Sequence, residues 1–166
     1  MFLFVAAIGA TVTAIFELTV GPYLQIDHAQ PHLVFVLAIV CTIAVGLESG
    51  LVWAFVGGIA LDALAQRPLG STSFALIVTV GIAASLARLF IRIRPLVVAP
   101  AVAILSIVYS MTLFVLLGAL GSSVASHDPL SVLAPGAAYD AVIGVIIGPL
   151  AVAVHDRYTD EARADW

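Results

Sequence analysis

The chain has 166 residues, of which 63% are hydrophobic and only 10% are charged, and its formal net charge is −4. Soluble domains carry about 25% charged residues, so this composition excludes a soluble globular domain and predicts a protein that uses lipid as its solvent. No basic patch points to nucleic acid, and a single cysteine, Cys41, excludes an internal disulfide. We interpret the chain as one polytopic membrane domain of the all-α class.

Six apolar segments predict six transmembrane helices. Gly21 and Pro22 end the first segment, and Pro31 suits the first turn of the second, where its missing N–H costs nothing. The second and third segments are shorter than the roughly 20 residues of a perpendicular span, which leaves open whether they tilt or form one re-entrant unit. The predicted helices cover about 2–20, 32–45, 49–64, 71–90, 96–120 and 135–154, within one domain at 1–154, and a frayed tail follows at 155–166.

Six spans place both ends of the chain on the same side of the membrane. Arginine prefers the cytoplasmic side, and Arg67 alone falls on the side opposite the termini in this count. We therefore predict that both termini and the tail are cytoplasmic. The arginines on the predicted cytoplasmic side are Arg88, Arg92, Arg94, Arg157 and Arg163.

Two carboxylates lie near predicted helix ends, and ionisable residues at membrane depth are by default functional suspects. Glu17 lies about one turn from the end of the first helix, where an interfacial anchor is favoured over a functional site. Glu48 lies in the tight turn before the third helix, where a carboxylate favours the positive end of the helix dipole. We predict that Glu48 caps this turn; a pair with an arginine at 88–94 is the alternative.

Asp62 lies near the outer end of the third predicted helix and follows Gly57 and Gly58. Gly58 and Asp62 are four residues apart and share a helix face, so a neighbouring backbone is able to approach while the carboxylate finds a donor. We favour a structural bond between helices over chemistry, with Arg67 as the nearest cation in the sequence.

Asp140 belongs to a face of the sixth predicted helix on which small residues recur every four positions. Gly144 and Gly148 form a small-xxx-small packing motif on this face. The face serves either packing within the chain or docking of another protein's helix. The candidate residues for a partner interface or an interhelical contact are Gly57, Gly58, Asp62, Asp140, Gly144 and Gly148.

The sequence shows no constellation that is typical of catalysis or metal binding. It contains no H-E-x-x-H, G-x-S-x-G or Cys/His metal spacing, so we predict no enzyme activity, no metal and no cofactor. Ser106 and Ser110 are expected to bond to carbonyls of their own helix. The histidines lie in or beside predicted outer loops, or in the tail, at His28, His32, His127 and His155.

Four local features resemble the bacterial rod shape-determining protein MreD family. The first helix ends with ELTVGPYL at 17–24, and the second opens with PHLV at 31–34, similar to the family's R-P-D/N-L/W-V, although the usual basic residue is missing. FVGGIALD at 55–62 is similar to the family's G-F-x-x-G-x-x-x-D, and Leu69-Gly70 is similar to its L-G turn. The last two features together are the most specific.

The resemblance implies a non-enzymatic scaffold of the cell-elongation machinery in the bacterial inner membrane. Its implied partner is the bitopic protein MreC, and through it the peptidoglycan synthase pair of RodA with a class B penicillin-binding protein, and MreB filaments. The family also looks similar in fold to the substrate-binding subunits of energy-coupling-factor vitamin transporters, an analogy that does not carry function. The alternative function is therefore a small-molecule-binding transporter subunit, which would need a polar pocket; the chain has no asparagine and few glutamines, which disfavours it.

Overall fold

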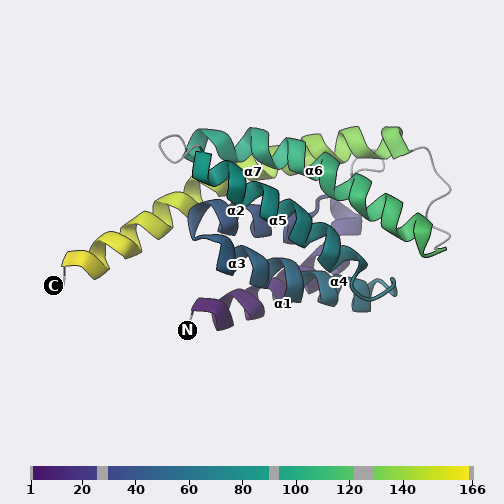
Figure 1. Ribbon diagram of the computed structural model, residues 1–166, viewed down its shortest axis with the longest axis horizontal. Helices are drawn as coiled ribbons and strands as arrows, with labels where there is room; N and C mark the ends of the chain where they lie inside the picture. The colour runs from purple at the N-terminus through teal and green to yellow at the C-terminus, as the bar shows by residue number, and fades with distance from the viewer. Residues whose placement is uncertain (1, 26–29, 90–93, 122–128, 165–166) are drawn as a thin grey trace.

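The computed structural model describes residues 2–25, 30–89, 94–121 and 129–164, and all regular secondary structure in these residues is helical (Figure 1). Helices α3, η2 and α4 follow one another without a break, so the described chain forms six helical segments. Five of them are long and apolar enough to cross a membrane. The elements are α1 (Phe2–Val20), η1 (Gly21–Leu24), α2 (Leu33–Ala44), α3 (Leu47–Val52), η2 (Trp53–Gly57), α4 (Gly58–Leu64), α5 (Ser71–Leu89), α6 (Arg94–Ala119) and α7 (Pro129–Ala164).

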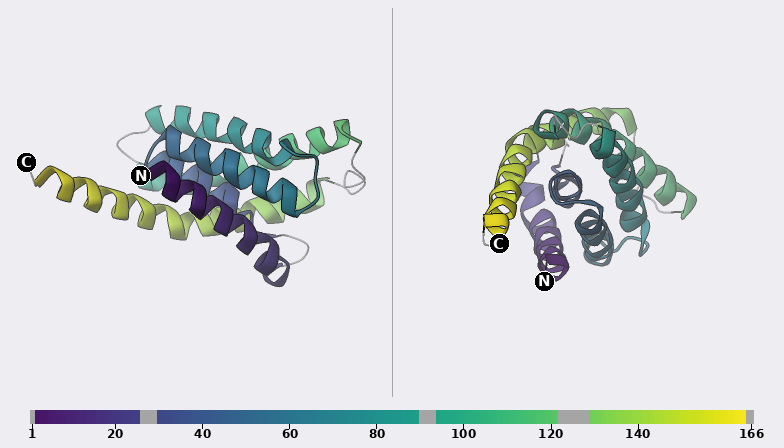
Figure 2. Two further views of the ribbon diagram at one scale, coloured as in Figure 1. Left: turned by 90° about the horizontal axis from the view of Figure 1, so that it is seen from below. Right: turned by 60° about the vertical axis from the view of Figure 1, so that its left-hand side comes forward.

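The observed helices follow the six predicted segments closely, and the largest difference is in α7. This helix runs for 36 residues to Ala164, well past the predicted end at 154. Figure 2 shows its C-terminal part extending beyond the other helices. The prediction of a frayed tail is therefore wrong for residues 155–164, because the helical backbone continues without a break.

The bundle has two distinct ends. The N-terminus of α1, the α2–α3 turn at 45–46 and the C-terminus of α5 lie together with the C-terminus of α7 at one end, which we call the terminal end (Figure 1). The end of α1, the α4–α5 connection at 65–70 and the end of α6 lie at the other, which we call the far end.

The central element is α2, which contacts α1, α3, α5, α6 and α7. Nine of its 12 residues are buried, including Val34, Phe35 and Ile39. A helix of this length spans about 18 Å, well short of the roughly 30 Å hydrocarbon core. Its first N–H groups therefore need hydrogen-bond acceptors from inside the protein.

A π-helical turn, η2, interrupts the long helix from 47 to 64. Such a turn leaves a carbonyl without its usual α-helical donor, and the Ser73 hydroxyl of α5 donates to the Phe55 carbonyl at 3.1 Å. Gly57, the last residue of the turn, and Gly58, the first residue of α4, are buried against neighbouring helices. The turn thus lies directly before Gly58, where α4 packs against the backbone of α5 at Ser73.

Candidate functional site

Carboxylates from three different helices accept hydrogen bonds from the N-terminal backbone of other helices at the far end. The simplest case is Glu17 of α1, whose Oε2 accepts from the Val34 N–H of α2 at 2.7 Å. The prediction that Glu17 is an interfacial anchor is wrong, because this half-buried side chain turns inward and caps α2. The short length of α2 explains why an acceptor is needed there.

Asp140 of α7 supplies the second cap of α2 and joins three helical elements. Its Oδ1 accepts from the His32 N–H at 2.9 Å, and its Oδ2 accepts from His32 Nδ1 at 2.9 Å. The Ser106 hydroxyl of α6 donates to the same Oδ2 at 2.6 Å. Asp140 is fully buried, and these contacts provide hydrogen-bond partners for both of its oxygens.

The His32 ring is held from its other side by aromatic contacts. It lies edge-on to the Tyr109 ring of α6 with centroids 5.5 Å apart, and Tyr109 stacks on Phe35 of α2 at 5.1 Å. Because a carboxylate only accepts, the contact with Asp140 places a proton on Nδ1. The surrounding chain thus determines the orientation of the ring.

Sequence reasoning missed His32, Ser106 and Tyr109 as members of this cluster. The prediction that Ser106 bonds to its own helix is wrong, since its hydroxyl donates to Asp140. His32 was expected only beside an outer loop. The position of His32 directly after Pro31 was a signal, because a short helix begins there and the first N–H groups of that helix need an acceptor.

Asp62 forms the third carboxylate cap, at the start of α5. Its Oδ2 accepts from the Gly70 N–H at 2.8 Å, its Oδ1 accepts from the Ser71 hydroxyl at 3.1 Å, and both oxygens lie 3.1 Å from the Thr72 N–H. The side chain is fully buried. Asp62 therefore closes the α4–α5 turn and binds the positive end of α5.

We expect Asp62→Ala to destabilise the protein by about 2–3 kcal/mol, since the helix cap is lost and buried N–H groups are left unpaired. The measurement is the melting temperature of the detergent-solubilised protein. Asp62→Asn is the matched control, because its amide oxygen still accepts one of these bonds, and its loss should be smaller. Equal melting temperatures for the wild type and Asp62→Ala would contradict the capping role.

The candidate glycines face other helices of the same chain. A Cβ on Gly58 would lie 2.5 Å from the Ser73 Cα, and one on Gly57 would lie 2.6 Å from Val34 Cγ1. A Cβ on Gly144 would lie 3.0 Å from Val102 Cγ2 of α6. The structure thus places these positions, together with Asp62 and Asp140, at contacts between helices of the chain itself.

Gly148 is buried on α7, one turn beyond Gly144. With Asp140 bonded to Ser106 and Gly144 against Val102, the small-residue face of α7 packs on α6. Another protein's helix would have to displace α6 to reach this face.

Glu48 lies in the first turn of α3 but does not cap it. The N-cap is Gly46, whose φ of +136° favours glycine, and no side chain bonds there. Glu48 is exposed, and among the described residues no ion pair joins it to Arg88. Glu48 therefore has the predicted place in the first turn, where its charge favours the helix start without a capping hydrogen bond.

The hydrogen bonds of Glu17, Asp62 and Asp140 indicate what kind of site these carboxylates form. The carboxylates accept hydrogen bonds from donors of their own chain. Within the described residues, no group of three His, Cys, Asp or Glu side chains is placed to hold a metal ion. These hydrogen bonds join neighbouring helices at the far end of the bundle, so the arrangement has a structural role.

The fold and these contacts define a multi-pass helical membrane protein whose polar interior ties its own helices together. The chain belongs to the family of rod shape-determining protein MreD, because the model of that family matches residues 1–154. It is therefore a rod shape-determining membrane protein of a structural family. No curated protein and no solved structure matches the chain.

Proposed function

We propose that the protein is a non-enzymatic scaffold of the cell-elongation machinery in the bacterial inner membrane, where it binds an MreC-like bitopic protein. Through that partner it contributes to the regulation of peptidoglycan synthesis by RodA and a class B penicillin-binding protein, and connects to MreB. The membership of residues 1–154 in the MreD family is the observation that carries this proposal.

The interior contacts support a scaffold. Glu17, Asp62 and Asp140 all accept bonds from helix N-termini of the same chain, so they stabilise a rigid surface. The expected fold similarity to energy-coupling-factor transporter subunits stays a prediction, since no solved structure matches.

We also propose an orientation with both termini in the cytoplasm. The two termini lie at the same end of the bundle (Figure 1), and α6 begins there with Arg94. Arg67 lies in the α4–α5 connection at the far end. This distribution of arginine favours a cytoplasmic terminal end.

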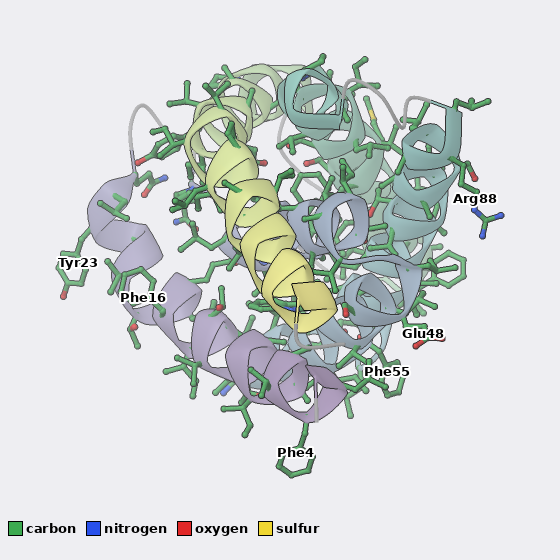
Figure 3. The ribbon with its side chains drawn as sticks, turned by 90° about the vertical axis from the view of Figure 1, so that its left-hand side faces the viewer. Phe4, Phe16, Tyr23, Glu48, Phe55 and Arg88 are labelled. Carbon is green, nitrogen blue, oxygen red and sulfur yellow. The ribbon has the colours of Figure 1, made fainter. Side chains whose placement is uncertain are left out.

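The partner helix, in this proposal, packs on an outward face, and the interior glycines and aspartates shape the bundle behind it. Among the five candidate spans, α1 is the least buried inside the protein. Its exposed apolar side chains include Phe4 and Phe16, which point away from the bundle in Figure 3, and also Ile8 and Val12. A helix in lipid associates by close packing, and α1 presents the widest free surface for it.

The proposal is tested by purifying the tagged protein in mild detergent and identifying by mass spectrometry what accompanies it. We expect stoichiometric recovery of an MreC-like bitopic protein. A photo-cross-linking amino acid at Ile8 should capture that protein, whereas the same group at the fully buried Val34 should not. Recovery of transporter ATPase subunits without a bitopic protein would contradict the scaffold function; cross-linking at Ile146 of α7 instead of Ile8 would move the contact to another face.

A further inference from the structure

A cavity of about 200 Å³ opens at the terminal end, between the α2–α3 turn and the last turns of α5. Its walls are largely apolar, with Val45, Leu47 and Ala87 among the lining residues. Among the described residues, one charged side chain, Arg88, also lines it. The cavity therefore combines a cationic group with an apolar surface.

Arg88 is the charged donor that this cavity offers. Among the described lining residues, the only other side chain with a polar group is Thr42, and its hydroxyl donates to the Ala38 carbonyl at 2.6 Å. Arg88 is exposed, and no carboxylate within the described residues forms an ion pair with it. Glu48 lies on the same side of the molecule (Figure 3) but does not line the cavity.

The position of the cavity suits a molecule that is partly in the membrane. Arg88 lies in the last turn of the candidate membrane span α5, and the end of a span is where we expect the hydrocarbon core to give way to headgroups. Val45 and Leu89 are exposed beside it, so apolar surface continues from the cavity onto the outside of the bundle. An amphiphile is able to use both parts at once.

We propose that this cavity binds the phosphate group of an anionic phospholipid, with Arg88 as its cationic ligand and the apolar walls against the adjoining glycerol and acyl chain. Basic pockets between membrane helices are a recognised form of lipid site. The apolar lining favours a lipid over free phosphate, which would gain nothing from Val45 or Leu47. The cavity is remote from the Asp140 cluster, and lipid binding there would be a property additional to the proposed scaffold function.

The test is native mass spectrometry of the detergent-purified protein with phosphatidylglycerol, phosphatidylcholine or inorganic phosphate added at equal concentration. We expect the wild type to retain phosphatidylglycerol preferentially. Arg88→Gln should reduce this retention about fivefold, the effect of one arginine at an anionic lipid surface. Arg67→Gln, at the far end, is the matched control and should retain the lipid as the wild type does.

Three results would overturn the proposal. They are equal retention of phosphatidylglycerol by Arg88→Gln and the wild type, equal retention of phosphatidylglycerol and phosphatidylcholine by the wild type, and displacement of the lipid by inorganic phosphate. Arg88 is exposed, so its variant should fold; an unchanged melting temperature without lipid verifies this. A smaller lipid-induced rise in the melting temperature of Arg88→Gln than of the wild type would be an independent supporting result.

Discussion

Gly58→Ala should leave the protein poorly folded, because the new Cβ would lie 2.5 Å from the Cα and 2.6 Å from the backbone nitrogen of Ser73. Both atoms belong to the backbone of α5, so no side-chain rotation relieves the clash. The helices α4 and α5 would have to separate, which also strains the Asp62 cap at the start of α5. We expect a loss of about 3 kcal/mol or more, equivalent to a melting temperature lower by roughly 10 °C.

The measurement is the melting temperature of the protein in mild detergent, read by size-exclusion chromatography after heating. Gly81→Ala is the matched control on α5, because a Cβ there meets nothing within 4 Å. Gly144→Ala should fall between the two, since its closest contacts are the side-chain atoms of Val102 at 3.0–3.2 Å. A Gly58→Ala protein as stable as Gly81→Ala would refute the close approach of α4 and α5.

Asp140→Ala should cost a comparable amount, roughly 3–5 kcal/mol, because removing one partner of a buried charged network leaves the others unpaired. Three donors would lose their acceptor: the His32 N–H, the His32 ring and the Ser106 hydroxyl. Of the bonds from the start of α2 to carboxylates in the described residues, the one from Val34 to Glu17 would remain. We expect reduced accumulation in membranes and a lower melting temperature in detergent.

Conservative variants separate the contributions to this cluster. Ser106→Ala removes one bond and should cost less than Asp140→Ala. In a double-mutant cycle, the losses for His32→Ala and Asp140→Ala should not be additive, because either change removes the contact between the His32 ring and Asp140. The bond from the His32 backbone N–H is lost only in Asp140→Ala. Additive losses would show that the two residues act independently and would contradict the cluster.

The sequence by itself determined the class of the protein and most of its helices. The apolar segments are continuous and local, so they predict spans that need no knowledge of the neighbours. Helix starts at Pro31 and after Gly70 follow from local backbone chemistry, and the observed α2 and α5 begin at Leu33 and Ser71. Motifs within short segments also carried the resemblance to the family that matches 1–154.

Only the tertiary structure decided the partners of the polar groups. His32 and Asp140 are 108 residues apart, and Ser106 is 34 residues from Asp140, so no local pattern connects them. The sequence left both interpretations of Gly144 and Asp140 open, because a small-residue face is able to pack on a helix of the same chain or of another protein. In the folded bundle, α6 packs against that face, and donors from α2 and α6 lie next to that carboxylate. Burying a carboxylate in an apolar medium is strongly unfavourable unless such donors surround it.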